Sequence, residues 1–265
     1  MAKTEPYTSD IKDNEWELLR RLLPGPKKLG RPPRYPQRLM LNAIFYITHS
    51  GCPWRLMPHE FPHWRLCYYY FAKWQKEGVW EKLNAALRDR VRNKAGKKKA
   101  PTAAAIDSQS VKTAGQRGER GFDAGKKVLG RKRHILVDSL GLLLAVFVHS
   151  AAIQDRDGAK TLLLKAWRFG WLRVIWADGG YAGQLVEWVR QLKLGRYAKL
   201  EIIRKIGPGF KLLPKRWVVE RTFAWLSRYR RLARDYEVKT SHSTAFIYVA
   251  ACRIMARRLA KSSLG

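Results

Sequence analysis

The sequence predicts a chain in two parts, an all-α part followed by a mixed α/β part with an open sheet. Three observations predict this fold class. In about the first 95 residues, apolar side chains recur at the three- and four-residue spacing of helices. From Thr102 onward, short apolar runs typical of strands alternate with amphipathic helical segments. Between them, residues 94–100 include three consecutive lysines beside Gly96, and Pro101 follows. We therefore expect a helical domain at 1–95, a basic linker at 96–102, a second domain at 103–240 and a C-terminal helix at 241–265 that packs on the second domain.

Four helices are predicted in the first part. They are expected at Ser9–Leu23, Tyr35–Ser50, His63–Gly78 and Val79–Asn93. Pro24 cannot continue the first helix, and Gly51 is a typical stop for the second. A proline-rich turn leads into the third. Helix, turn and helix with basic flanks resembles a helix-turn-helix arrangement, and a plain helical bundle is the alternative.

The second part is predicted to alternate strands and helices. Strands at His134–Val137 and Leu142–Val148 flank Asp-Ser-Leu-Gly, which indicates a hairpin. A Gly- and Lys/Arg-rich loop is expected at Gln116–Arg133. The other strands are expected at Ala103–Ser108, Leu172–Ala177 and Leu200–Arg204, and the helices at Asp157–Phe169, Gln184–Leu194, Pro214–Tyr236 and Ser243–Leu259. Three strands followed by helix, strand, helix, strand and helix is the order of an RNase H-like fold with a mixed five-stranded sheet.

The charge balance predicts a polyanionic partner. Lys and Arg outnumber Asp and Glu by 53 to 21, which gives a formal net charge of +32. Neutralising phosphates releases condensed counterions, so such an excess on a folded chain is typical of nucleic-acid binding. A ribosome-associated protein or an anionic-membrane binder is the alternative from charge alone.

Cysteine usage and hydropathy predict an intracellular protein. The three cysteines show no Cys-x-x-Cys spacing, which argues against a disulfide framework or a structural zinc site. Residues 1–10 lack the apolar core of a signal peptide. The longest apolar stretch, Leu140–Val148, is far shorter than the roughly 20 residues of a membrane span. We expect a cytoplasmic protein without a membrane partner.

Three carboxylates are candidates for a shared site. Asp107 lies on the first predicted strand, Asp178 ends the fourth, and Glu220 lies on the long predicted helix, opposite its apolar stripe. Carboxyl ends of strands border ligand crevices in open sheets. Singly each signal has a plainer interpretation: Asp178 before Gly-Gly can be a turn, and Glu220 can be a solvated partner of Arg216. Asp107 is harder to dismiss, because a buried charge without a partner is costly.

Three carboxylates in a basic chain suit metal-dependent phosphodiester chemistry. Two Mg²⁺ ions about 3.5–4 Å apart can activate a water or a 3′ hydroxyl and neutralise the leaving oxygen. Hard cations need oxygen ligands, and Mn²⁺ can replace Mg²⁺. No Walker-type sequence predicts a nucleotide cofactor. His59 and His63 have the spacing of a zinc-protease pair, but Pro62 would break the helix that this pair requires.

Longer motifs around these acids carry a family resemblance. They are Gly30-Arg31-Pro32-Pro33, Ser50-Gly51-Cys52-Pro53-Trp54-Arg55, Ile106-Asp107-Ser108-Gln109-Ser110, Gly130-Arg131-Lys132-Arg133-His134, Ile153-Gln154-Asp155-Arg156-Asp157-Gly158, Trp176-Ala177-Asp178-Gly179-Gly180-Tyr181 and Arg216-Trp217-Val218-Val219-Glu220-Arg221. With these motifs the chain resembles bacterial insertion-sequence transposases of the DDE type, in the insertion-sequence-five (IS4-like) family.

The resemblance implies a function and a metal-binding triad, Asp107, Asp178 and Glu220. It implies a bacterial, nucleoid-associated DNA transposase that binds the terminal inverted repeats of its element, cleaves them hydrolytically and joins the 3′ hydroxyl to target DNA, as a dimer or higher oligomer on double-stranded DNA. Arg216 then belongs to an Arg-x-x-x-Glu signature. The family's Tyr and Lys positions around this signature are Leu213 and Ser227 here, with Arg228 adjacent.

Basic residues near the predicted sheet and in the first turn are candidate DNA contacts. They are Arg31, Arg34, Arg131, Lys132, Arg133, Arg216, Arg228 and Arg231. Two alternatives to a transposase stay open: a non-catalytic DNA-binding or regulatory derivative, and an RNase H-like nuclease without strand transfer.

Overall fold

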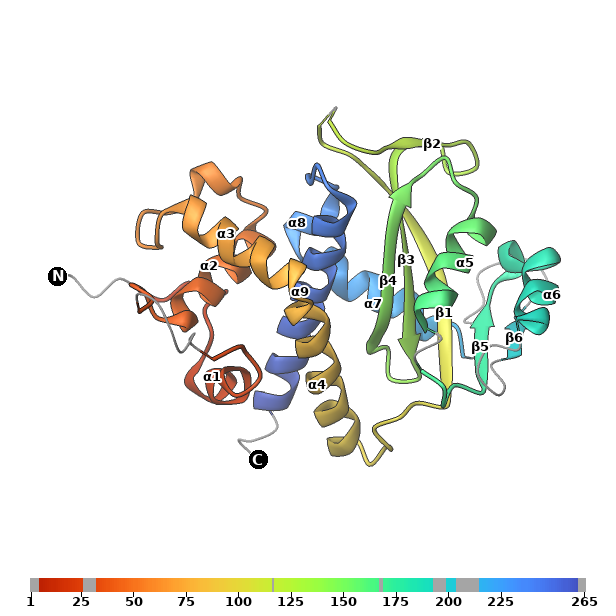
Figure 1. Ribbon diagram of the computed structural model, residues 1–265, viewed down its shortest axis with the longest axis horizontal. Helices are drawn as coiled ribbons and strands as arrows, with labels where there is room; N and C mark the ends of the chain where they lie inside the picture. Colours follow the sequence, from red (N-terminus) through yellow and green to blue (C-terminus); the bar gives the residue numbers. More distant parts are fainter. Residues whose placement is uncertain are drawn as a thin grey trace.

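Helices and one sheet make up the protein, which we describe from a computed structural model. The structure describes residues 5–25, 32–115, 117–166, 169–192, 199–203 and 215–261. In Figure 1 the N-terminal helices gather on one side, the sheet lies on the other, and the C-terminal helix α9 (Thr240–Lys261) runs between them. The fold is therefore a mixed α+β arrangement, as predicted.

The four predicted N-terminal helices are confirmed. They are α1 (Asp13–Arg20), α2 (Gln37–Ser50), α3 (Trp64–Lys76) and α4 (Val79–Lys94), with a short 3₁₀ turn, η1 (Trp54–Leu56), between α2 and α3. Gly51 ends α2 in the left-handed conformation, at φ +74°. His63 caps α3 from outside the helix, so His59 and His63 do not share a helix face and the zinc-protease pattern is excluded, as expected.

The sheet is mixed and has, among the described residues, one strand more than predicted. Its strands are β1 (Ala103–Lys112), β2 (Gly121–Asp123), β3 (Val128–Asp138), β4 (Leu143–Ser150), β5 (Val174–Ala177) and β6 (Lys199–Ile202). The order β4-β3-β1-β5-β6 runs across the sheet, and β2 pairs with the beginning of β3. The pairs β1–β3 and β3–β4 are antiparallel, whereas β1–β5 and β5–β6 are parallel. The hairpin predicted between the second and third strands is confirmed at Asp138–Leu142.

Two predicted segments were wrong. The loop expected at Gln116–Arg133 contains β2 and the first six residues of β3, because its basic side chains find acidic partners inside the protein. The single helix expected at Pro214–Tyr236 begins, within the described residues, as α7 (Trp217–Ser227) and is interrupted at Tyr229, whose backbone is extended at φ −89° and ψ 110°. A short helix, α8 (Arg230–Ala233), follows.

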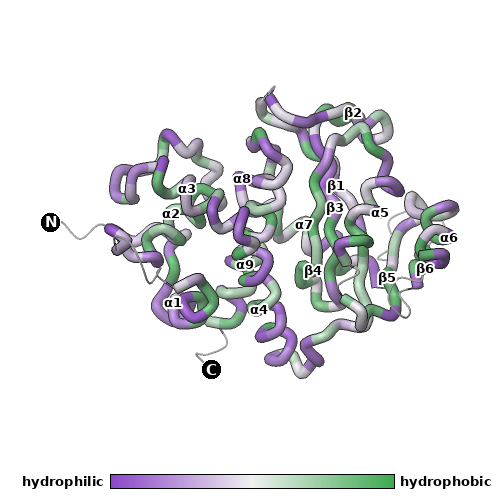
Figure 2. The backbone as a smooth tube through the Cα atoms, in the orientation of Figure 1, coloured by the Kyte–Doolittle hydropathy of each residue, from purple (hydrophilic) through white to green (hydrophobic). Residues whose placement is uncertain are grey.

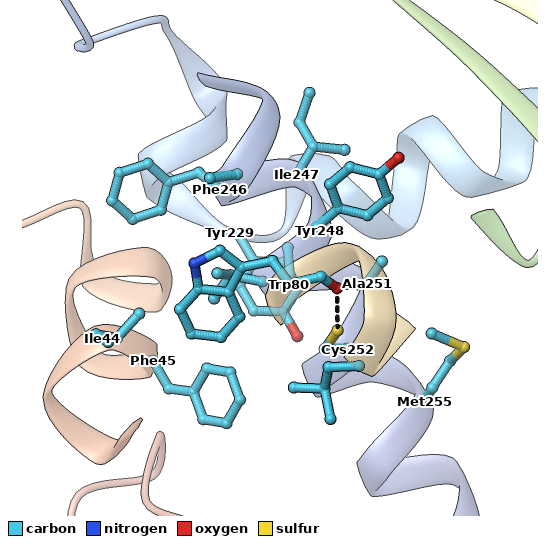
Figure 3. Close-up of a cluster of buried hydrophobic side chains, with 14 of the residues drawn as sticks. Ile44, Phe45, Trp80, Tyr229, Phe246, Ile247, Tyr248, Ala251, Cys252 and Met255 are labelled. Atoms are coloured by element: carbon cyan, nitrogen blue, oxygen red, sulfur yellow. Dashed lines mark hydrogen bonds between the residues drawn. The ribbon is translucent and has the colours of Figure 1, made fainter. Parts of the chain in front are cut away.

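Each face of the sheet is covered by helices. Helices α5 (Asp155–Ala166) and α6 (Gln184–Gln191) pack on one face with Ala104 and Ile106 of β1, whereas α7 and α9 pack on the other with Ala105. Alternate residues of β1 thus enter different hydrophobic clusters. The second cluster continues into the N-terminal helices, where Trp80 of α4 meets Phe246 and Cys252 of α9 (Figure 3). In Figure 2, green runs along much of β3 and β4, and the end of α4 is purple.

No helix among the described residues has both the length and the apolar character needed to cross a bilayer.

Candidate active site

The first two acids meet where β1 and β5 separate. The strands pair in parallel only at Ala103–Ala105 of β1. Asp107 lies two residues beyond the last pair, and Asp178 directly follows the end of β5. Because parallel strands end at the same side of a sheet, both carboxylates border the gap that opens there. Asp107 and Asp178 lie on the strand and at the strand end where the sequence predicted them, and the structure places them side by side.

Glu220 reaches the same place from helix α7. The helix packs on β1 and β3 through Val218, Val219 and Thr222, which are buried. At the helical repeat of 100° per residue, Glu220 lies outside this buried stripe, as the sequence predicted. Its side chain is 49% exposed.

One nitrogen atom of Arg216 contacts all three acids. Its Nη2 lies 3.3 Å from Asp107 Oδ2, 3.5 Å from Asp178 Oδ2 and 3.9 Å from Glu220 Oε1. Three carboxylates that are 71 and 42 residues apart along the chain therefore surround a single positive charge. The guanidinium is itself buried, and its Nε lies in the interior with no hydrogen-bond partner among the described residues.

The backbone fixes one oxygen of each aspartate and leaves the other for a cation. Asp107 Oδ1 accepts a hydrogen bond from the Ser108 N–H at 2.7 Å, and Asp178 Oδ1 accepts one from the Gly180 N–H at 2.8 Å. The Oδ2 atom of each faces Arg216. This arrangement orients both carboxylates before any ion or substrate arrives.

Burial sets the electrostatics of Asp107. Desolvation raises the pKa of this carboxyl to about 6, against the lowering effect of the Ser108 N–H and the Arg216 charge, and the Asp178 charge raises it further. Burial and the neighbouring acids destabilise the ionised form of Asp107, so a positive charge nearby stabilises it.

The carboxylate oxygens of the three acids are of the type that a hard divalent cation prefers, but Arg216 lies between them. Asp and Glu oxygens are the ligands that Mg²⁺ and Mn²⁺ prefer. As they stand, no three His, Cys, Asp or Glu side chains in the described part of the chain are spaced to hold a metal ion. The position among the carboxylates is taken by the guanidinium, which supplies the charge that a cation would bring.

A polar layer lies on the opposite face of β1 from Asp107, and the sequence did not predict it. Ser108 Oγ donates to Asp155 Oδ1 at 2.8 Å, and Lys132 Nζ lies 3.0 Å from the same oxygen. Tyr181, three residues after Asp178, is buried with its hydroxyl 3.4 Å from His134 Nδ1. The motifs containing Asp155 and Tyr181 were visible in the sequence, but nothing in their spacing assigned them to this layer.

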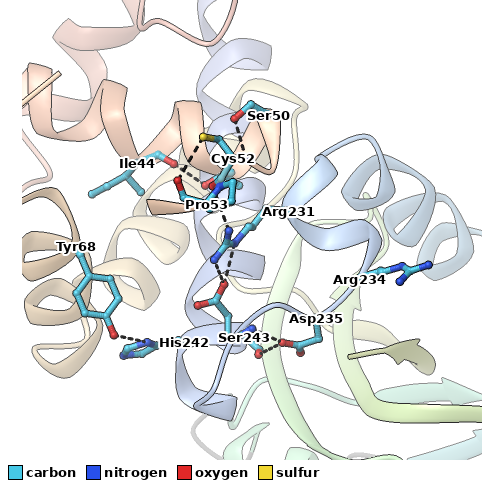
Figure 4. Close-up of polar contacts among 12 residues, drawn as sticks. Ile44, Ser50, Cys52, Pro53, Tyr68, Arg231, Arg234, Asp235, His242 and Ser243 are labelled. Carbon is cyan, nitrogen blue, oxygen red and sulfur yellow. Dashed lines mark hydrogen bonds and ion pairs between the residues drawn. The ribbon is translucent and has the colours of Figure 1, made fainter. Parts of the chain in front are cut away.

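Four of the basic residues predicted to contact DNA lie in the interior. Arg131 is fully buried, 3.0 Å from Asp235, and donates to Ser243 Oγ. Arg133 donates to the Leu232 carbonyl at 2.6 Å, and Lys132 is paired with Asp155 as described. Arg231 turns inward to Glu237 at 2.6 Å (Figure 4).

These four contacts correct the expectation. A buried cation with acidic and carbonyl partners is not available to phosphate, so we leave Arg131, Lys132, Arg133 and Arg231 out of the proposed DNA contacts.

The other predicted DNA contacts differ in position. Arg34 is exposed and lies over the ring of Tyr35, 5.4 Å from its centroid, and Arg228 is exposed after the end of α7. Arg216 belongs to the carboxylate cluster. Arg31 and Leu213 lie outside the described residues.

Comparisons with known proteins identify the family of both halves. Residues 11–84 match a family described as a putative transposase of the IS4/5 family, and residues 98–255 match the transposase DDE domain family. The chain is 31% identical over 136 residues to a putative transposase for insertion sequence element IS402 of Burkholderia cepacia, covering 47% of this chain and 62% of that protein.

Two further relatives match shorter stretches. An IS402 uncharacterized 16.2 kDa protein of Burkholderia cepacia is 32% identical over 111 residues, covering 40% of this chain and 74% of its own. The uncharacterized protein y4sN of Sinorhizobium fredii is 32% identical over 77 residues, covering 29% of this chain and 62% of its own. The DDE domain match includes all three clustered acids and more than half of the sequence. The chain therefore belongs to the transposase DDE domain family.

Proposed function

We propose that this protein is a DNA transposase that binds the terminal inverted repeats of its own insertion sequence, hydrolyses a phosphodiester at the element end and transfers the freed 3′ hydroxyl to target DNA. The observation that carries the proposal is the meeting of Asp107, Asp178 and Glu220 around one Arg216 nitrogen. A protein that only binds DNA gains nothing from three acids turned toward the phosphates.

The strand order supports an RNase H-like catalytic part. The sheet has three antiparallel neighbours, β4-β3-β1, followed by the parallel strands β5 and β6. In this part, which we propose to span 103–240, the acids come from the first strand, the end of the next parallel strand and a later helix. The division into domains at 1–95, 96–102, 103–240 and 241–265 is part of the proposal.

Asp107, Asp178 and Glu220 would hold two Mg²⁺ ions, with Mn²⁺ as a substitute. Asp107 and Asp178 would be shared between the ions and Glu220 would complete one site. When bound, the ions supply a deprotonated water or 3′ oxygen for attack and neutralise charge on the leaving oxygen.

The residues of the chain contribute orientation and charge. The Ser108 and Gly180 N–H groups hold the two aspartates so that one oxygen of each faces inward. Arg216 would balance the negative charge of the three acids and would give up its position among them to an ion. Arg34 and Arg228, both exposed, are proposed as contacts along the DNA.

The N-terminal helices are proposed to recognise the element ends. Helix α3 carries Arg65, Tyr69 and Lys76 on its exposed side and contains no acidic residue. Two ends must be brought together for transposition, so we propose at least a dimer on DNA.

Cleavage and strand transfer test the proposal together. The full-length protein is incubated with Mg²⁺ or Mn²⁺ and a duplex that carries the DNA flanking its gene, with a plasmid as target. We expect nicking at the element end, joined products, and a loss of roughly 10³-fold in rate for Asp107→Asn with DNA binding retained. Binding without cleavage by the unaltered protein would instead establish the non-catalytic derivative, and cleavage without joining would establish a nuclease.

A further inference from the structure

The edge of β1 beyond Ala105 is approached by a second cation. The Lys126 ammonium lies 3.4 Å from both the carbonyl oxygen and Oγ of Ser108, the residue next to Asp107. Both partners are neutral oxygens, and the ammonium also lies close enough to Asp107 and Asp155 to favour their ionised forms, with no ion pair to either among the described residues. The residue is exposed, unlike Lys132, which is buried and paired with two aspartates.

The turn that presents Lys126 is held in place by the sheet. Asp123, at the end of β2, accepts the Lys126 N–H on Oδ1 at 3.1 Å. Its other oxygen accepts the Ser110 hydroxyl of β1 at 2.6 Å and lies 3.4 Å from Lys132 Nζ of β3. Asp123 is itself buried. The backbone of Lys126 is thus tied to the same strand that carries Asp107, and the side chain does not depend on a free loop for its position.

The two cations approach the acids from different faces of the sheet. Arg216 comes from the end of α7, on the face where Asp107 Oδ2 lies. Lys126 contacts Ser108, whose side chain is directed to Asp155 of α5 on the other face. Between them lies the edge where β1 and β5 have parted and where Asp178 begins its turn.

We infer that Lys126 is a phosphate-binding residue of the active site, which holds the DNA backbone next to the scissile phosphate on the α5 side of β1. The inference deepens the proposed transposase function and depends on it. The ligand is a DNA phosphodiester, which a lysine recognises as a point charge with three donors. On DNA binding the ammonium exchanges its two weak contacts with Ser108 for a charged oxygen, which is the stronger partner.

Cleavage by Lys126 variants tests the inference, with the adjacent lysine as control. Lys127 is exposed and one residue away, but its backbone has φ +52° and it makes no described contact with β1. In single-turnover cleavage of the flanking-DNA duplex, Lys126→Met is expected to lose about 10- to 100-fold, the range for a hydrogen bond to a charged group. Lys126→Arg is expected to recover most of the rate, and Lys127→Met to stay near the unaltered protein.

A binding readout separates contact from folding. In the Asp107→Asn background, Lys126→Met should lower the slope of log affinity against log salt concentration by about one phosphate contact, with an unchanged melting temperature. Lys126→Gln serves the same comparison if the Met variant melts early. Unaltered cleavage and salt slope in these variants, or equal losses from Lys127→Met, overturn the inference. Absence of cleavage by the unaltered protein overturns the proposed function instead.

Discussion

A single residue, Arg216, places positive charge among the three acids. Three carboxylates around one point repel each other, and the most buried of them, Asp107, already has its pKa raised to about 6 by desolvation. The Arg216 charge is among the influences that lower this pKa. The Arg216 Nη2 donates to Asp107 Oδ2, and the other two acids lie within ion-pair distance of the same nitrogen.

Replacing Arg216 should make the fold depend on added metal. In Arg216→Gln the acids lose their cation, and we expect the metal-free protein to lose roughly 3 kcal/mol of unfolding free energy, the lower end of the cost of breaking a buried ion pair. Added Mn²⁺ should raise the melting temperature of this variant more than that of the unaltered protein, because no guanidinium competes for the carboxylates. Thermal melts across a Mn²⁺ titration measure both effects. An equal Mn²⁺ response in Glu220→Gln and Arg216→Gln would contradict the competition.

Residue by residue, the sequence predicted the acids better than the cations. Asp107, Asp178 and Glu220 could be located because strand ends and helix phase decide where a carboxylate points. Whether an arginine is exposed depends instead on acids far away in the chain. Arg131 is neutralised by Asp235, 104 residues later, and no local pattern reveals that pairing.

At the scale of elements, strand β1 organises the site by alternation. Asp107 faces α7, whereas Ser108 and Ser110 face the polar layer of α5, β2 and β3. A register shift of one residue would exchange these faces. The nine antiparallel pairs with β3 therefore fix which side of the sheet Asp107 faces as well as the fold.

At the end of α2, the packing of this helix against α8 depends on one glycine, Gly51. A Cβ on Gly51 would lie 3.1 Å from Cβ of Arg230, at the start of α8, and φ there is +74°. Gly78 has a similar φ of +67° but open space around it. We expect Gly78→Ala to cost roughly 1 kcal/mol for the left-handed backbone, and Gly51→Ala to cost more because α8 must also move. Urea unfolding of both variants measures the difference, and equal losses would show that the contact with α8 does not matter.

Helices and strands that a local sequence pattern determines were predicted correctly. Those whose bounds depend on tertiary contacts were predicted wrongly. The four N-terminal helices follow from apolar spacing with proline and glycine stops. The interruption at Tyr229 does not, because it lets Arg231 turn inward to Glu237 and to the Cys52 carbonyl (Figure 4). The basic stretch before His134 looked like a loop because its partners, Asp155 and Asp235, come later in the chain.

At the scale of the whole molecule, one hydrophobic core joins the N-terminal helices to the sheet. Helix α9 contacts α4 and β4 at once, and its Phe246 stacks on Phe71 of α3 with ring centroids 4.4 Å apart. Residues 97–99, three lysines, lie between α4 and β1 along the chain, and α9 packs between the N-terminal helices and the sheet (Figure 1). The N-terminal helices, α9 and the sheet face that carries α7 therefore share one packed interior.

The interior also holds several histidines, and they make the stability of the whole protein depend on pH. Burial lowers the pKa of His49, His149 and His242 below the ordinary 6.5, and that of His134 to about 3. These groups stay neutral in the folded protein but take up protons when it unfolds. Above pH 6.5 these histidines therefore do not affect the free energy of unfolding. As the pH falls from 6.5 toward their pKa values in the folded protein, they lower it.

We expect the unfolding free energy to be lower at pH 5 than at pH 7.5, with roughly 2 kcal/mol lost through His134 alone, since each proton contributes about 1.4 kcal/mol per pH unit. Asp107 and Glu237 oppose this trend, because burial raises their pKa values and protonation relieves them as the pH falls. Urea unfolding at both pH values, compared with His134→Gln, isolates the histidine contribution. The variant should show a smaller loss between pH 7.5 and 5, and an identical loss would mean that His134 accepts its proton in the folded protein, through a rearrangement of its stacked neighbour His149.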